Sequence, residues 1–441
     1  MSSTSSRDFS TAANREAAKL VDEAHRYVTA LVSRELRREL RPSGAGFTAE
    51  GLARLRAALA GPVESGAIPG LVALVDRGGD THVEALGTLH AGGGEPMHRD
   101  TVFRMASATK PVTAAAVMTL VDECRLRLDD PVDPWLPELA DRQVLRSLAG
   151  PVDDTVPARR AITVRDLLTF TFGFGVLMAG PDVPIQAAVQ RSGLYGDGAF
   201  PSGDPDEWMR RLGSLPLMYQ PGERWLYNTG SDVLGVLIAR VTGRSFGSYL
   251  RERLFEPLGM KDSGFWVPED RIHRLPTSYA HDPATGELTV YDPAADGRFS
   301  RPQEFEVGGS GLVSTADDYR VFCRMLLDQG MGPAGRVLSR QAVELMTTDQ
   351  LTPDQKTEKD RFPELFGDHG GFGFGMGVRT RRRGYANTGQ FGWDGGLGTS
   401  VQMDPVEDLT LILLTQTAMD TMDSPRLVRD FHTMAYRALD A

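Results

Sequence analysis

Two residues whose chemistry suits nucleophilic catalysis lie three positions apart in the first third of the chain. Ser107 and Lys110 bound the tetrad Ser-Ala-Thr-Lys, where a strand-like run, TVFRMA, passes into an apolar helical run, PVTAAAVMTLV. Residues i and i+3 share one face of a helix, so the Lys110 amine can reach the Ser107 hydroxyl. A lysine buried among apolar side chains has a lowered pKa and can accept a proton at neutral pH. The pair therefore predicts a serine nucleophile with a lysine base.

A second serine, Ser245, lies in Gly-Arg-Ser-Phe-Gly and matches the G-x-S-x-G elbow of α/β-hydrolases. The run before it, SDVLGVLIARVTG, has the pattern of an apolar helix that ends at Gly243, so no strand leads into the turn. We expect Ser245 to cap the next helix. Ser107 has a similar alternative, in which it caps a helix and Lys110 forms an ion pair. That alternative fits an exposed helix better than the apolar run PVTAAAVMTLV.

The composition indicates a globular protein and argues against several kinds of partner. The chain has 441 residues, 41% of them hydrophobic, and a net charge of -11. Such an acidic chain is not suited to binding phosphates, so we expect no nucleic-acid partner. Its two cysteines form no disulfide framework, its N-terminus lacks the pattern of a secretory signal, and no run of apolar residues is long enough to span a bilayer. The sequence predicts a cytoplasmic protein with no membrane partner.

Metal and cofactor motifs are not found in the sequence. The eight histidines include no pair at helical ligand spacing and no H-E-x-x-H. The glycine-rich run FGDHGGFGFGMG lacks both the lysine and the following helix of a phosphate-binding loop. We therefore predict no metal site and no cofactor.

The elements that must position Ser107 alternate between strands and helices. Residues 12–40 have apolar side chains at helical spacing and predict an amphipathic arm, and Thr48 is placed to cap a second helix. A strand hairpin is expected in LVALVDRGGDTHVEALGTLHA, helices separated by long loops over about 131–300, and further strands in GFGFGMGVRTR, SVQMDP and LTLILLTQ before a last helix. A sheet built from both ends of the chain around a helical middle is an α+β architecture.

Several extended stretches carry a family resemblance: FRMASATKPVTAAAVMTLVDECRL, ITVRDLLTFTFGFG, PGERWLYNTGSDVLGVLIARVTG, GGSGLVSTADDY and FGWDGGLGTSVQMDP. Over residues 46–441 the chain resembles the serine β-lactamase and penicillin-binding-protein superfamily, closest to the class C-like branch of family VIII carboxylesterases and related acyltransferases. The resemblance implies a β-lactamase-like antiparallel sheet flanked by helices, with a mostly helical second subdomain. We expect an N-terminal helical extension over 1–45 and a catalytic domain over 46–441, with its α/β part at about 46–130 and 301–441 and its helical part at about 131–300.

The resemblance also implies roles for residues far from Ser107. Tyr227 matches the family's tyrosine, which shares the proton with the lysine, and Asn228 follows it in a motif one residue shorter than the family's Y-x-N. The third motif falls on Trp393, Asp394 and Gly395, which we expect with Asn228 to contact the substrate.

The family's oxyanion hole falls on Ser107 and Gly396, whose backbone N–H groups are expected to hold the developing charge. Trp393 stands where β-lactamases have a cation that binds the substrate carboxylate, and we expect it to offer only stacking or packing.

The function implied by these residues is acyl transfer through an acyl-enzyme on a small-molecule acyl substrate. A serine hydrolase acting on carboxylic esters or activated acyl donors fits the tryptophan of the third motif. An acyltransferase of a natural-product pathway, making an ester or amide, is an open alternative, as is a β-lactamase or D,D-peptidase-like enzyme or a penicillin-recognising domain without turnover. Whether the protein forms a homo-oligomer is left open.

Overall fold

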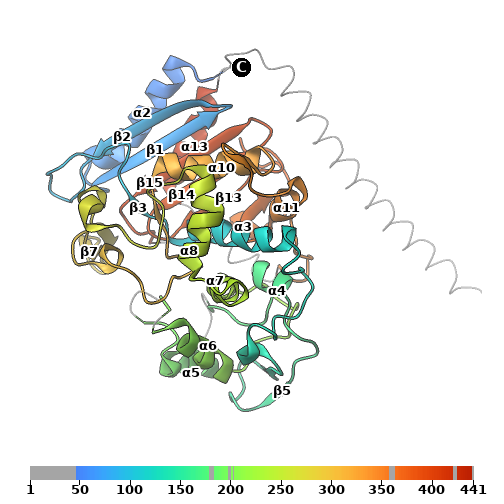
Figure 1. Ribbon diagram of the computed structural model, residues 1–441. Helices are drawn as coiled ribbons and strands as arrows, with labels where there is room; N and C mark the ends of the chain where they lie inside the picture. The colour runs from blue at the N-terminus through green and yellow to red at the C-terminus, as the bar shows by residue number, and fades with distance from the viewer. Residues whose placement is uncertain are drawn as a thin grey trace, which may run out of the picture.

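A computed structural model describes residues 46–177, 183–196, 200–201, 203–356, 363–420 and 425–439 (Figure 1). The helix expected at 12–40, and with it the extension over 1–45, lies outside the described residues. No helix within the described ranges is long and apolar enough to cross a membrane.

The centre of the fold is a seven-stranded sheet in the order β11-β12-β13-β14-β15-β1-β2, with every neighbouring pair antiparallel. In chain order its strands are β1 (Gly70–Arg77), β2 (Asp80–Gly87), β11 (Gly370–Phe372), β12 (Gly377–Arg379), β13 (Phe391–Gly395), β14 (Thr399–Asp404) and β15 (Leu409–Thr415). The first and last parts of the chain meet where β1 pairs with β15, with Leu74 opposite Ile412. The α+β prediction and the β-lactamase-like sheet are confirmed.

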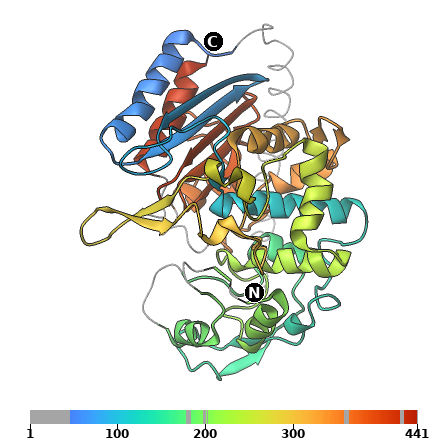
Figure 2. The same ribbon diagram turned by 60° about the vertical axis from the view of Figure 1, so that its left-hand side comes forward.

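The central strands β1 and β15 are buried along their whole length because both faces of the sheet are covered. Alternate residues of β1 point to opposite faces. Leu71 and Val75 pack in a core with α2 (Ala49–Glu64) and α13 (Arg426–Ala438), which lie side by side on one face (Figure 2). Val72 and Leu74 face the larger core, which holds α3 (Thr109–Asp122) and α10 (Ala316–Leu327). As expected, Thr48 caps α2, its hydroxyl accepting from Gly51 N at 3.1 Å.

Between these parts of the chain, residues 131–300 hold mainly short helices. These are α4 (Val164–Leu168), α5 (Pro184–Ser192), α6 (Pro205–Ser214), α7 (Thr229–Thr242), α8 (Phe246–Leu250) and α9 (Glu256–Leu258), with the short helical turns η2 (Pro137–Leu139), η4 (Arg251–Phe255), η5 (Glu269–Arg274) and η6 (Arg298–Ser300). Two hairpins interrupt them, β4 (Gln143–Leu145) with β5 (Thr155–Pro157) and β6 (Ser278–His281) with β7 (Leu288–Asp292). After α10 come β9 (Met331–Gly332), β10 (Gly335–Arg336), α11 (Arg340–Met346) and α12 (Pro363–Phe366).

The strand expected in TVFRMA is much shorter than predicted. Only Phe103–Arg104 forms a strand, β3, and it pairs with β8 (Val313–Ser314) outside the main sheet. The reason is that Met105 already has helical backbone angles, and Ala106, with a φ of 46°, continues the chain into the helical turn η1 (Ala106–Ala108). Helix α3 follows at once, so residue 107 lies at the junction of a strand and a buried helix.

Candidate active site

Helix α3 fixes the position of Ser107 and Lys110. Each of its residues from Thr109 to Leu120 is buried, which explains why the run is apolar on all sides. Ser107 lies in η1 directly before this helix and is half-buried. The left-handed backbone of Ala106, uncommon for a residue with a side chain, presents Ser107 at the end of the helix.

Lys110 is fully buried, and its amine is held by two oxygens. Its Nζ donates to Ser107 Oγ at 2.8 Å and to the backbone carbonyl of Gly309 at 2.6 Å. The same nitrogen lies 4.7 Å from the centre of the Tyr227 ring. The predicted contact between the lysine amine and the serine hydroxyl is therefore present.

Tyr227 reaches Ser107 from the segment that leads into α7. Its hydroxyl donates to Ser107 Oγ at 2.8 Å, so the serine oxygen contacts Lys110 and Tyr227 at once. The indole Nε1–H of Trp393, on β13, donates to the Tyr227 oxygen at 3.1 Å. The Trp393 N–H is therefore a polar partner of the tyrosine, and the expectation that Trp393 offers the substrate only stacking or packing stays a prediction.

An aromatic cluster holds these rings in place. Trp225 stacks on Tyr227 with ring centres 5.6 Å apart, and Phe170 meets the same ring edge-on at 6.1 Å. Phe372 packs edge-on against Trp393 at 5.4 Å. With rings on both sides, the tyrosine hydroxyl is directed toward Ser107 rather than toward solvent.

The end of β13 lies against the turn that carries Ser107. A β-carbon added to Gly395 would lie 2.4 Å from the carbonyl oxygen of Met105 and 2.2 Å from Thr399 Oγ1, so no larger residue fits without movement. Gly396 comes next and is exposed, with open space where a side chain would stand. Among the described residues no acceptor takes the N–H of Gly396 or of Ser107. These are the two groups expected to form the oxyanion hole.

Asp394 is not brought to Ser107. Neighbouring residues of a strand point to opposite faces, so its carboxylate lies on the far face from Trp393. There it accepts from Ser400 Oγ at 2.7 Å and from Gln402 Nε2 at 3.3 Å. It also faces His432 of α13, whose pKa is lowered by burial although the Asp394 charge opposes that shift. The geometry gives no support to a substrate contact by Asp394.

Asn228 occupies the N-cap position of α7 with a φ of 87°. Its side chain makes no hydrogen bond with the residues that the structure describes. Its Oδ1 lies 3.1 Å from where a β-carbon of Gly309 would stand, close to the carbonyl that holds Lys110. The structure therefore places Asn228 beside the site, without a defined role.

Sequence reasoning missed Asp232 on the first turn of α7. This carboxylate is 0% exposed, and its Oδ1 accepts from the backbone N–H of Gly309 at 2.8 Å. Burial raises the pKa of Asp232 to about 7, against the opposing effects of the Lys110 charge and the Gly309 hydrogen bond. An acidic residue inside the apolar run SDVLGVLIARVTG was the signal that could have found it.

Ser245 is an exposed helix cap, as expected. Its Oγ accepts from Ser248 N at 3.2 Å at the start of α8.

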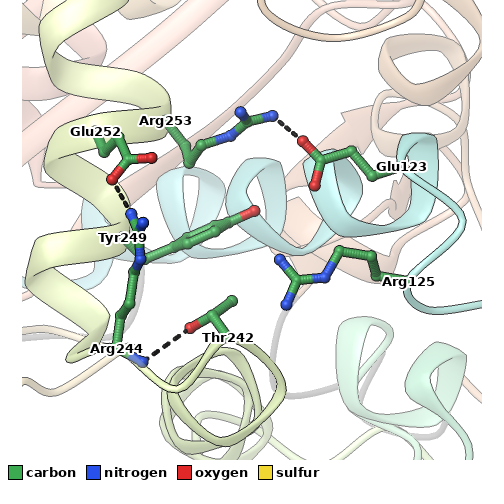
Figure 3. Close-up of a pocket in the computed structure, with 7 residues that line it drawn as sticks. All are labelled: Glu123, Arg125, Thr242, Arg244, Tyr249, Glu252 and Arg253. Atoms are coloured by element: carbon green, nitrogen blue, oxygen red, sulfur yellow. Dashed lines mark hydrogen bonds and ion pairs between the residues drawn. The ribbon is translucent and has the colours of Figure 1, made fainter.

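The neighbouring Arg244 lines a pocket between the end of α3, α7 and α8 (Figure 3). In this pocket Arg244 pairs with Glu252, and Arg253 pairs with Glu123. None of the residues grouped around Ser107 lines it. In the described part of the chain, no group of three or more His, Cys, Asp or Glu side chains is arranged to hold a metal ion.

The antiparallel sheet, the buried helix that begins at Ser107 and the serine–lysine–tyrosine contact define a β-lactamase-like serine enzyme. The chain belongs to the beta-lactamase family, whose model matches residues 55–430. It is 41% identical over 366 residues to Protein Rv1367c of Mycobacterium tuberculosis, covering 81% of this chain and 88% of the relative. It is 31% identical over 393 residues to Esterase EstB of Burkholderia gladioli, covering 85% of this chain and 92% of the relative.

A solved structure described as "EstCE1, a hydrolase with promiscuous acyltransferase activity" superposes with a TM-score of 0.72 at 26% identity, covering 88% of this chain and 99% of that one. At the level shared by these relatives, this protein is a serine hydrolase or acyltransferase of the β-lactamase superfamily.

Proposed function

We propose that this protein is a serine hydrolase that forms an acyl-enzyme at Ser107 with carboxylic esters or activated acyl donors. One observation carries the proposal: Ser107 Oγ lies 2.8 Å from both Lys110 Nζ and the Tyr227 hydroxyl. A serine hydroxyl is a weak nucleophile unless a neighbouring base takes its proton, and both neighbours can do so once deprotonated.

In the acylation step, Ser107 Oγ attacks the substrate carbonyl while its proton passes to the Lys110–Tyr227 pair. The carbonyl oxygen gains negative charge, which the N–H groups of Ser107 and Gly396 stabilise. Tyr227 then returns the proton to the leaving alcohol, and the acyl group stays on the serine. In the second step, water attacks the acyl-serine while its proton passes to the Lys110–Tyr227 pair. The pair then returns a proton to Ser107 Oγ as the carboxylic acid leaves.

Trp393 supports esters as the substrate class. Because residue 393 is not a lysine or histidine, the site lacks the cation that would bind a β-lactam carboxylate at this position. The Trp393 N–H instead donates to the Tyr227 oxygen, where it stabilises negative charge during proton transfer. The family relationship to Esterase EstB points to the same substrate class.

Acyl transfer is the second candidate, and one observation favours it. The structurally similar EstCE1 is described as a hydrolase with promiscuous acyltransferase activity. If an alcohol or amine takes the place of water in the second step, the same residues transfer the acyl group to it. Product analysis of ester turnover with an added alcohol or amine separates the two outcomes.

The test of the proposal is the site of acylation. A fluorophosphonate should label the wild-type protein at Ser107, and Ser107→Ala should lose both the label and at least about 10³-fold in turnover of a nitrophenyl ester. Ser245→Ala, the matched control at the other serine motif, should keep both. A label mapped to Ser245, or turnover retained by Ser107→Ala, contradicts the proposal.

A further inference from the structure

A buried carboxylate beside Lys110 takes no part in the steps described above. Asp232 is fully buried, its Oδ1 accepts from Gly309 N, and its Oδ2 is buried without a hydrogen-bond partner among the described residues. An ionised carboxylate oxygen in that position is costly unless a cation lies nearby. Lys110 is the cation whose charge acts on Asp232.

The two side chains are joined through one residue, Gly309. The N–H of Gly309 donates to Asp232 at 2.8 Å, and its carbonyl accepts from Lys110 Nζ at 2.6 Å. A β-carbon on Gly309 would lie 2.6 Å from Asp232 Oδ1, so a larger residue there would displace the carboxylate. The adjoining Gly308 carbonyl accepts from Thr113 Oγ1 of α3 at 2.7 Å. Segment 308–309 thus connects α7, which carries Asp232, to α3, which carries Lys110.

We propose that Asp232 is a positioning residue of the acylation site: its carboxylate is the buried countercharge of Lys110 and, through Gly309, holds the lysine amine on Ser107. This inference rests on the proposed function, since it assigns Asp232 a role in setting the protonation of the Lys110 base. It adds a residue that lies outside the three sequence motifs.

The titratable groups around Asp232 are few. Helix α3 contributes Lys110, and the segment after α5 contributes Tyr195, whose hydroxyl bonds to Thr229 Oγ1 at 2.6 Å and whose pKa is raised by burial, so that it stays neutral. Gly309 contributes its backbone N–H, which donates to Asp232 Oδ1. With the pKa of Asp232 raised to about 7 by burial, its charge changes in the range where turnover is measured. The ionised carboxylate of Asp232 favours the protonated ammonium form of Lys110. A neutral group at residue 232 favours the unprotonated amine.

The direct test is the pH dependence of kcat/KM for a nitrophenyl ester in Asp232→Asn. Asparagine keeps an oxygen for Gly309 N–H but removes the negative charge, so Lys110 should lose its proton more readily. The acidic limb of the profile should move to lower pH by about one unit, the size of shift that a neighbouring opposite charge produces.

Asp318→Asn is the matched control. Asp318 is also buried, accepts from Asp262 N and Ser263 Oγ, and has a pKa raised by burial. The pH profile of kcat/KM for Asp318→Asn should match that of the wild type. A purely structural role of Asp232 would lower the amount of active enzyme without moving the limb, so profiles of Asp232→Asn and wild type with the same apparent pKa refute the inference.

Labelling of the same preparations separates this failure from failure of the proposed function. A wild-type protein that a fluorophosphonate does not label at Ser107 overturns the proposed function and this inference together. Labelling at Ser107 with unshifted profiles overturns the inference alone.

A second measurement serves if Asp232→Asn does not fold. Lys110→Met leaves the Asp232 carboxylate without its countercharge. The folded-state pKa of a buried carboxylate is raised, so its burial lowers stability as pH rises. The Tm difference between wild type and Lys110→Met should therefore be larger at pH 8 than at pH 5. A difference that does not change with pH contradicts the role of countercharge.

Discussion

Trp393→Phe isolates the hydrogen bond between the third motif and Tyr227. Phenylalanine keeps an aromatic ring against Phe372 but removes the Nε1–H that lies 3.1 Å from the Tyr227 oxygen. A hydrogen bond between two neutral groups contributes about 0.5 to 1.5 kcal/mol. In the proposed mechanism Tyr227 gives a proton to the leaving alcohol, so negative charge develops on its oxygen and the same bond strengthens to about 1.5 to 3 kcal/mol. The substitution therefore removes an interaction that is stronger in the transition state.

The expected result is a fall in kcat of roughly ten-fold, with KM for a nitrophenyl ester changing little, because about one to two kcal/mol of the interaction is specific to the transition state. Burst kinetics should assign the loss to acylation. Trp225→Phe is the control, since it trims the ring stacked on Tyr227 at 5.6 Å and leaves the Trp393 N–H in place. If Trp393→Phe retains wild-type kcat, or if Trp225→Phe loses as much, the hydrogen bond is not what Trp393 contributes.

Three further predictions concern the same site. Lys110→Arg keeps a positive charge that cannot be lost, so turnover should fall about 10³-fold while Tm is preserved. In the wild type, kcat/KM should rise with pH through one apparent pKa that belongs to the coupled Lys110–Tyr227 pair. Substantial turnover by Lys110→Arg would remove the lysine from the mechanism. Gly395→Ala should lower Tm and acylation, because its β-carbon meets the Met105 carbonyl at 2.4 Å, whereas Gly396→Ala enters open space and should keep its Tm; equal Tm values for both contradict this packing. Wild type should prefer a nitrophenyl ester to a chromogenic cephalosporin by about two decades in kcat/KM, and Trp393→Lys should narrow the gap, since a charge-assisted contact contributes about 1.5 to 3 kcal/mol; efficient cephalosporin turnover by the wild type is the opposing result.

Local patterns in the sequence were enough to predict the elements around Ser107. The spacing of Ser107 and Lys110 depends only on helical geometry, and the runs of β1 and β15 are apolar because both faces of these strands are buried. The predicted length of the strand before Ser107 is wrong, because nothing in TVFRMA signals the positive φ of Ala106.

The contacts between distant segments were not predictable in the same way. The Trp393 N–H reaches Tyr227 across 166 positions of the chain, and Gly309 reaches Asp232 across 77, so both depend on how strands and helices pack. The placement of Asp394 is different. The alternation of side chains along a strand already implies that it and Trp393 point to opposite faces. The roles given to Tyr227, Asn228 and Gly396 stay predictions.

The pairing of β1 with β15 has a consequence for how the protein is made. Gly396 follows Ser107 by 289 residues, and β15 follows Gly396, so a chain emerging from the ribosome carries its serine long before the strands that complete the site. At about 5 to 20 residues per second, this interval lasts roughly 15 to 60 s. Throughout it, the backbone N–H and C=O groups on the edge of β1 that faces β15 have no strand partner, and Gly396, which is proposed to hold the oxyanion with Ser107, has not been made. The nascent chain therefore carries an unpaired strand edge, which is prone to association with other chains, until β15 has been made.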